Sequence, residues 1–139
     1  GATAVIEGAG DHCCEYMTGG RVVVLGTTGS NFAAGMSGGI AYVLNEKGNF
    51  DYYCNMGMVE LSLVDEYSDV SELTDLISRH YKYTNSRKAK MILDDINKYI
   101  PIFIKVIPYD YKKVMQEQKL EELKKKIAGV ELDLEISAR

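Results

Sequence analysis

Two glycine-rich segments contain residue types that bind nucleotides or phosphate. Residues 4–10 read as a strand that runs into a G-x-G turn, as in a dinucleotide-binding fold. Cys13 stands where that fingerprint has its third glycine, and no acidic residue ends a second strand about 20 residues later. The interval from Gly29 to Gly35 does not fit a phosphate-binding loop, and no lysine follows it. We therefore predict that this chain has no cofactor-binding residues and binds no cofactor of its own.

His12, Cys13 and Cys14, with Cys54 farther along, have the side chains of a metal site. Zinc and iron–sulfur sites prefer cysteines separated by two residues, whereas adjacent cysteines in a strand or corner point in different directions. We predict packing thiols and no metal ligands. Three cysteines without a secretory leader favour reduced thiols, and we expect a cytoplasmic location.

Catalysis by an acid, a base or a nucleophile needs such groups to be paired. The two histidines, His12 and His80, lie in different halves of the chain, and neither has a convincing serine or cysteine partner. Asp11 with Glu15 is the best carboxylate pair, but no second feature gives these residues acid and base roles. We predict no catalytic residue in this chain.

Composition limits the class of protein. With 139 residues, 46% hydrophobic and 26% charged, the chain fits one domain with a modest core. The net charge of -4 argues against nucleic acid as the main partner. The sequence contains no run of about 18 apolar residues, so we predict no membrane span. Residues 1–68 carry a charge of -6 and residues 69–139 a charge of +2, which indicates two halves of different character.

The first half repeats every 19 residues. Eleven of the 13 glycines lie in the first 48 residues, and they recur in register with apolar residues. The glycine columns are Gly1, Gly20, Gly39 and Gly10, Gly29, Gly48, and the apolar columns are Val5, Val24, Val43 and Ile6, Leu25, Leu44. Three copies of one period are typical of a solenoid.

The length of the repeat predicts a single-stranded parallel β-helix of about three rungs, a mainly β fold. Each turn would carry one of the strands 3–6, 21–25 and 40–44, with equivalent residues stacked at the usual strand spacing. Glycine at a corner supplies a positive φ and leaves no Cβ to collide with the next rung. Replacing Gly20 or Gly39 with a β-branched residue is therefore expected to be costly.

The apolar columns predict which side of the coil is covered. The ring of Tyr42 fits poorly inside a narrow coil and is expected to point outward. Strand alternation would place Ile6, Leu25 and Leu44 on the same outer face. Such an apolar stripe needs a cover, which we expect the rest of the chain to supply.

The second half has a helical pattern. Asp69 with Glu72 predicts a capping box, and apolar residues at helical spacing follow. Ser86 is expected to cap a second helix that ends before Pro101. These two helices would bury Leu73, Leu76, Ile77, Tyr81, Ala89, Ile92, Leu93 and Ile96.

The last part of the chain is predicted to contain two extended segments around a helix. Residues 103–107 read as extended, and Asp110 is expected to cap a third helix. From Val130 to Ile136 apolar and polar residues alternate strictly, which predicts a final strand. We thus expect a glycine-rich β-helix over residues 1–67 and a helical extension over residues 68–139 that packs on it, as one structural domain.

Several motifs together resemble the GXGXG domain of glutamate synthase large subunits. They are residues 8–20, 22–26, 31–44, 54–55, 58–61, 80–84 and 103–112, and the resemblance covers roughly residues 1–115. It implies a right-handed parallel β-helix at the C-terminal end of a multidomain oxidoreductase of glutamate biosynthesis and nitrogen metabolism.

The resemblance also implies what the parent enzyme does. The parent adds the amide nitrogen of glutamine reductively to 2-oxoglutarate and yields two glutamates. An amidotransferase domain with an N-terminal cysteine releases ammonia, and an FMN-binding barrel with an iron–sulfur cluster reduces the imine, with electrons from NADPH or ferredoxin. None of those residues corresponds to a residue here, where the first position is Gly1. The implied role is a non-catalytic scaffold, with the amidotransferase domain, the FMN-binding domain and the small subunit as partners.

Two alternatives to this role stay open. The C subunit of formylmethanofuran dehydrogenase has a similar glycine-rich β-helix, so the chain could belong to that oxidoreductase. The chain could also be a free-standing subunit with its own ligand. Family members carry further β-helix turns before the position of Gly1. The first rung is therefore expected to present an unpaired edge, and the isolated chain to form a homo-oligomer.

Overall fold

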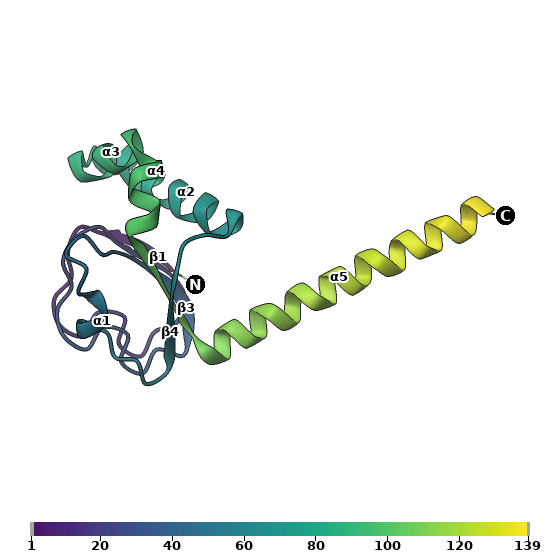
Figure 1. Ribbon diagram of the computed structural model, residues 1–139, viewed down its shortest axis with the longest axis horizontal. Coiled ribbons are helices and arrows are strands. Elements are labelled where there is room, and N and C mark those ends of the chain that lie inside the picture. The colour runs from purple at the N-terminus through teal and green to yellow at the C-terminus, as the bar shows by residue number, and fades with distance from the viewer. Residues whose placement is uncertain (1, 139) are drawn as a thin grey trace.

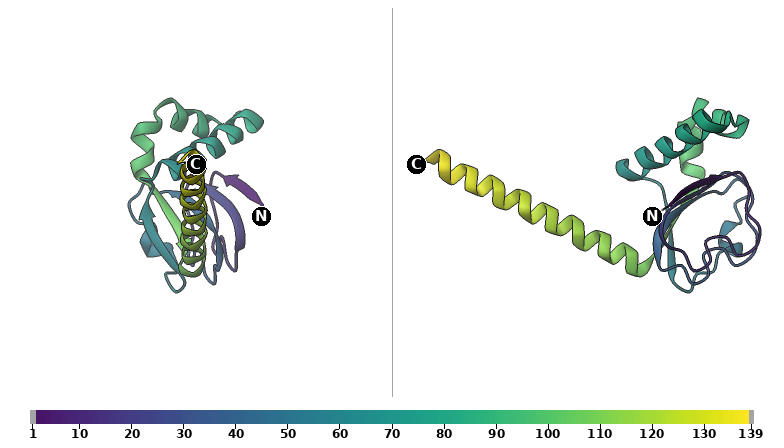
Figure 2. Two further views of the ribbon diagram at one scale, coloured as in Figure 1. Left: turned by 90° about the vertical axis from the view of Figure 1, so that its right-hand side faces the viewer. Right: turned by 180° about the vertical axis from the view of Figure 1, so that it is seen from behind.

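A computed structural model describes residues 2–138. Within this range five strands form one open sheet in the order β1-β2-β3-β5-β4 (Figures 1 and 2). The strands are β1 (Thr3–Ile6), β2 (Thr18–Val24), β3 (Gly38–Leu44), β4 (Val59–Leu63) and β5 (Phe103–Pro108). The first three strands are parallel, whereas β5 lies antiparallel between β3 and β4. The sheet is therefore of mixed direction.

The helices differ in how they meet the sheet. They are α1 (Phe50–Tyr53), α2 (Tyr67–Thr84), α3 (Arg87–Asp94), α4 (Ile96–Tyr99), a short 3-10 turn η1 (Ile100–Ile102) and α5 (Tyr109–Ala138). Figure 1 shows α2, α3 and α4 grouped on one side of the sheet, while α5 runs away from the rest of the molecule to the C-terminus. None of the helices in residues 2–138 is long and apolar enough to cross a membrane.

The predicted β-helix is not the fold of this chain, which is mixed α/β. Each glycine-rich repeat contributes one strand, and the segments between the strands are turns and loops rather than further strands. Left-handed residues explain this, since His12, Cys14, Tyr16, Asn31 and Ala33 all have a positive φ, which interrupts an extended backbone. The stack then ends at β3, where the antiparallel strand β5 from the second half takes the next place. The periodicity of the first half could not show this insertion.

The loops of the first half nevertheless lie on one another. The loop after β1 donates backbone N–H groups to the loop after β2, from Ala9 to Thr27, from His12 to Ser30 and from Tyr16 to Ala34, over 2.8–3.0 Å. Each bond spans 18 residues, the same offset as between β1 and β2, so the loops stack in the register in which the strands pair.

The strand register departs from the predicted columns by one residue between β1 and β2, and again at the start of β2, where Thr18 pairs with Gly38. Between β2 and β3 Val24 faces Val43, as the 19-residue columns require. Between β1 and β2, however, Val5 faces Val23 and Ile6 faces Val24, an offset of 18. A slip of one residue moves a side chain to the opposite face of a sheet. Val5 therefore packs with the apolar core under helices α2 and α3, here called the helix-covered core. Ile6 packs with the core under the glycine-rich loops, the loop-covered core, which is the reverse of the prediction for Ile6.

Each face of the sheet carries its own apolar core. Leu25, Tyr42 and Leu44 lie on the face under the helices, as predicted, and pack with the buried side chains of α2 and α3. Among these are the predicted helix residues Leu73, Leu76, Ile77, Ala89 and Ile92. The opposite face packs against the glycine-rich loops and α1, with Phe32 and Phe50 in an edge-to-face contact at 5.0 Å. The predicted cover over the apolar stripe is thus formed by α2, α3 and their neighbours.

Two predictions for the second half need correction. Asp69 and Glu72 are no capping box, because α2 begins two residues before Asp69 and has Glu66 at its N-cap position. Residues 130–136 are the last turns of the 30-residue helix α5 instead of a strand. No strand in residues 2–138 pairs with this segment. On a helix, a two-residue alternation distributes apolar side chains around the axis.

Other predictions for the second half are confirmed. The hydroxyl of Ser86 accepts a hydrogen bond from the backbone N–H of Ala89 at 3.1 Å, as an N-cap residue does. Residues 103–107 are extended, and they form β5 with Pro108. Because β5 lies between β3 and β4, the segments 1–67 and 68–139 share one sheet.

Candidate functional site

Two members of the first predicted glycine column, Gly20 and Gly39, lie where consecutive repeats approach each other closely. Gly20 and Gly39 have φ angles of +84° and +81°. A Cβ on Gly20 would overlap the carbonyl oxygen of Ala2, and one on Gly39 would lie 2.7 Å from the carbonyl oxygen of Gly20. These glycines therefore meet both conditions of a crowded corner. Gly1, the first member of the column, lies outside the described residues.

The second glycine column is less uniform. A Cβ on Gly29 would lie 2.7 Å from the backbone nitrogen of Asp11, whereas Gly10 and Gly48 have no atom within 4 Å of a Cβ. Gly48 has a φ of +72°, so its conformation alone favours glycine. This column thus combines one crowded position with two open ones.

The candidate thiols Cys13, Cys14 and Cys54 lie on the loop-covered side of the sheet. The sulfur atoms of Cys13 and Cys14 are 3.9 Å apart, and all three thiols are free. The hydrogen bond from Cys14 lowers the pKa of Cys13 to about 7, and the same contact raises that of Cys14. Burial raises the pKa of Cys54 to about 11. Cys13 is therefore the most acidic of the three thiols.

His12 and Glu15 form an ion pair on the surface, with 3.2 Å between Nδ1 and Oε2. Asp11, the other member of the best carboxylate pair, accepts a hydrogen bond from the backbone N–H of Ser30 at 2.8 Å. That bond holds one glycine-rich loop to the next. Among residues 2–138 no group of three or more histidine, cysteine or carboxylate side chains could hold a metal ion.

His80 lies at the junction of β1, α2 and α3. Its Nε2 atom is buried, makes no hydrogen bond within residues 2–138, and lies 3.8 Å from the Glu7 carboxylate. The other oxygen of that carboxylate accepts a hydrogen bond from the Ser86 hydroxyl at 2.7 Å. Glu7 therefore ties the end of β1 to the cap of α3.

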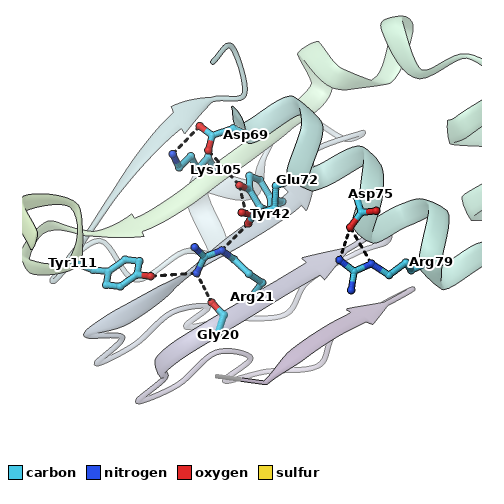
Figure 3. Close-up of polar contacts among 9 residues, drawn as sticks. All are labelled: Gly20, Arg21, Tyr42, Asp69, Glu72, Asp75, Arg79, Lys105 and Tyr111. Carbon is cyan, nitrogen blue, oxygen red and sulfur yellow. Dashed lines mark hydrogen bonds and ion pairs between the residues drawn. The ribbon is translucent and has the colours of Figure 1, made fainter. Parts of the chain in front are cut away.

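A group of polar side chains lies between the sheet and α2 (Figure 3). Arg21 of β2 donates from Nε to Glu72 of α2 at 2.6 Å, and Lys105 of β5 donates to Asp69 of α2 at 2.7 Å. The hydroxyl of Tyr42, on β3, lies 3.3 Å from Glu72 and 3.4 Å from Asp69. We call these five residues the sheet–helix clasp. It connects the three central strands of the sheet to a single helix.

The clasp also reaches the beginning of α5. Arg21 donates to the hydroxyl of Tyr111 at 3.3 Å and to the carbonyl of Gly20 at 3.0 Å, and its guanidinium lies 5.8 Å from the centre of the Tyr111 ring. The corner at Gly20, the sheet and the first turn of α5 therefore meet at one side chain.

The electrostatics of the clasp favour a permanent structural contact. Burial and the charges of Glu72 and Asp69 raise the pKa of Tyr42, so its hydroxyl stays protonated as a donor. Burial lowers the pKa of Arg21, but its hydrogen bonds and the Glu72 charge outweigh this effect and raise it. Arg21 and Lys105 are each paired with a carboxylate, which is how proteins retain charges that are largely removed from water.

The sequence analysis did not predict the clasp. Its signals were the charged residues Arg21 and Lys105 within otherwise apolar strands, and the carboxylates Asp69 and Glu72 on one face of a helix. A separate open cleft of about 400 Å³ lies beside Thr27, Asn45, Phe50 and Lys88. None of the predicted glycine-column residues lines that cleft.

Comparison with known proteins identifies the relatives of this domain. The GXGXG motif family matches residues 1–109. "Glutamate synthase [NADH]" of Schizosaccharomyces pombe is 50% identical over 127 residues, which are 90% of this chain and 6% of that protein. "Glutamate synthase [NADPH] large chain" of Bacillus subtilis is 48% identical over 123 residues, 86% of this chain and 8% of that protein.

A third relative is a chloroplast protein. "Ferredoxin-dependent glutamate synthase, chloroplastic" of Spinacia oleracea is 47% identical over 107 residues, 77% of this chain and 7% of that protein. The names of the three relatives thus include NADH, NADPH and ferredoxin. The chain spans less than a tenth of the length of each, and it is similar to one region of them.

Proposed function

This chain belongs to the GXGXG motif family, and on that premise we propose that it is a non-catalytic scaffold domain of glutamate synthase. The glutamate synthases named above share about half of their residues with this chain over one short region. In this proposal the parent enzyme transfers the amide nitrogen of glutamine to 2-oxoglutarate and forms two glutamates in a reductive reaction. The domain itself takes no part in the chemistry.

The sheet–helix clasp is the observation that carries the proposal. Two ion pairs and Tyr42 connect strands β2, β3 and β5 to α2, on the face of the sheet that carries the helix-covered core. Interactions of this kind hold elements in one arrangement, because moving α2 would leave partly buried charges without partners. A unit that fixes the positions of neighbouring domains needs this rigidity.

The partners and cofactors of the proposal follow from the family resemblance. We propose that the domain packs against an amidotransferase domain and an FMN-binding domain, and also meets the small subunit. FMN, an iron–sulfur cluster and electrons from NADPH or ferredoxin would belong to those parts, with none bound here. The cytoplasmic location and the homo-oligomer of the isolated chain remain parts of this proposal.

The alternative role in formylmethanofuran dehydrogenase loses its basis. It rested on a shared β-helix, and the fold here is a mixed sheet with helices. The relatives described above are all named glutamate synthases. We therefore retain the glutamate synthase scaffold as the one proposed function.

Recovery of the tagged chain from its native host tests the proposal. We expect amidotransferase and FMN-binding polypeptides, identified by mass spectrometry, to be recovered with the wild-type chain. A tagged Gly39→Val variant, whose fold is expected to be damaged, controls for binding that does not require the folded surface. Recovery of the chain alone, or with subunits of a different oxidoreductase, would contradict the scaffold role.

The isolated chain provides a second test. We expect no glutaminase activity, no reductase activity, and no flavin absorbance after incubation with FMN followed by gel filtration. A yellow, flavin-loaded protein would count against a non-catalytic role even if the expected partners were recovered.

A further inference from the structure

Helix α5 leaves the body of the molecule after its second turn. Tyr111 and Met115 still pack against the helix-covered core, but every residue from 116 to 138 is exposed. In Figures 1 and 2 the helix extends as a single rod, with its end far from the sheet. Most of the stability of a helix in a protein comes from packing of its apolar face, so a helix whose last 23 described residues are all exposed calls for a partner.

One face of the rod carries an apolar stripe at heptad spacing. Its residues, here called the α5 stripe, are Leu120, Leu123, Ile127, Val130 and Leu134. Their separations of three, four, three and four residues are the a and d positions of a coiled coil. Each of them is between 51% and 65% exposed. The stripe therefore has the residue spacing of a short coiled-coil seam.

The charges beside the stripe indicate which partner fits. At the positions that flank it, the first half has Lys119, Lys124 and Lys126, and the second half has Glu131 and Asp133. In two parallel copies Lys119 would repel Lys124 of the other copy, which cancels the attraction between Lys126 and Glu131. In two antiparallel copies with Leu123 opposite Leu134 and Ile127 opposite Val130, Lys126 faces Asp133 and Lys124 faces Glu131. Each of these attractive pairs occurs twice by symmetry.

We propose that the α5 stripe is a homodimer interface, on which a second copy of this chain binds antiparallel to form a two-stranded coiled coil. This arrangement places the two sheet domains at opposite ends of the paired helices, because each body lies at the beginning of its own α5 (Figure 1). The bodies therefore do not collide. Lys119 also lies 3.7 Å from Glu66 of its own chain, a contact between side chains that are both more than 60% exposed.

A matched pair of substitutions tests the interface in the 139-residue chain. Ile127→Glu places two carboxylates at the centre of the seam, whereas Ile136→Glu makes the same change at an exposed site off the stripe. Both isoleucines are more than half exposed, so neither change should disturb the folded monomer. Circular dichroism checks this.

Light scattering after gel filtration provides the readout. At high micromolar concentration we expect twice the monomer mass for the wild type and for Ile136→Glu, and the monomer mass for Ile127→Glu. A monomeric wild type would overturn the proposal, because the stripe would then not bind a second copy of this chain. A dimer that survives Ile127→Glu would overturn it as well, because association would then use another surface, such as the open edge at β1.

Carbodiimide cross-linking tests the direction of the pairing. Lys126 and Asp133 are 7 residues apart, about 10.5 Å along one helix, too far for a bond without a spacer within a single helix. We expect a Lys126–Asp133 link in the covalent dimer band, identified by mass spectrometry of its peptides. A dimer band that contains only links between equivalent ends of the two helices would contradict the antiparallel arrangement.

Discussion

The two faces of the sheet are covered in different ways. Under the glycine-rich loops, backbone groups of one repeat contact those of the next, and Gly20 and Gly39 leave no room for a side chain. Under the helices, side chains make the contact, with an apolar core and the sheet–helix clasp. The loop-covered face is therefore expected to tolerate little change in the size of its glycines, whereas the helix-covered face depends on paired charges.

A substitution in the glycine column should have the largest effect. Gly39→Ala forces a positive φ on a residue with a Cβ and places that atom 2.7 Å from the carbonyl of Gly20. We expect a loss of about 3 kcal/mol or more in the free energy of unfolding. Urea unfolding measures it.

Gly48→Ala is the matched control for that change. Gly48 also has a positive φ, but no atom lies within 4 Å of a Cβ placed there. We expect a loss of only about 1–2 kcal/mol, the cost of the left-handed conformation. Equal losses in the two variants would show that close approach between repeats does not matter.

Breaking the clasp, on the helix-covered face, should lower the free energy of unfolding by an intermediate amount. Glu72→Gln removes the negative charge that pairs with Arg21, and we expect it to cost about 1–2 kcal/mol in urea unfolding. Asp75→Asn provides the control, because the Asp75–Arg79 pair is exposed on the same helix and should contribute nothing measurable. If both variants lost the same stability, the clasp would be an ordinary surface contact.

High pH should weaken the helix-covered face selectively. Because the pKa of Tyr42 is raised in the folded chain, its contribution to stability is complete below pH ~10, the usual tyrosine pKa, and is lost at higher pH. Each pH unit above 10 should lower the free energy of unfolding by up to about 1.4 kcal/mol. Tyr42→Phe cannot ionise, so the variant should lose less stability than the wild type between pH 8 and pH 10.5. Parallel curves for the two proteins would refute this assignment.

The smallest effect is on the rate at which the thiols are labelled, and stability is unchanged. With its pKa lowered to about 7, Cys13 should react with iodoacetamide at pH 8 at least ~10 times faster than the buried Cys54, since the thiolate is the reactive form. Peptide mass spectrometry resolves the two sites. Faster labelling of Cys54 would mean that the loop-covered face opens more readily than its packing indicates.

The sequence predicted local features of this molecule better than its overall architecture. The 19-residue interval located three parallel strands, and Ser86 was correctly identified as a helix cap. The 18-residue step from β1 to β2 was missed, because apolar residues at both positions 5 and 6 fit either register. Because Ile6 pairs with Val24 instead of Leu25, it lies on the opposite face of the sheet from the one predicted.

The remaining misses arose from long-range contacts. The place of β5 between β3 and β4 joins residues about 60 apart in sequence, and no local pattern encodes that pairing. The clasp was also missed, although Lys105 within an apolar strand should have prompted a search for a buried partner. Asp69 and Glu72 offered a simpler local reading as helix caps, and that reading was wrong.

Hydrogen exchange of backbone amides tests the central claim most directly, namely that both halves of the chain form one rigid body through β3 and β5. Amides of β3 and β5 that bond across the pair should exchange only by global unfolding, so the two strands should have the same opening free energy. In Gly39→Ala the opening free energies of both strands should decrease by the same amount. Exchange of β5 at a much lower free energy than β3 would contradict the account, because the second half would then open independently of the glycine-rich half.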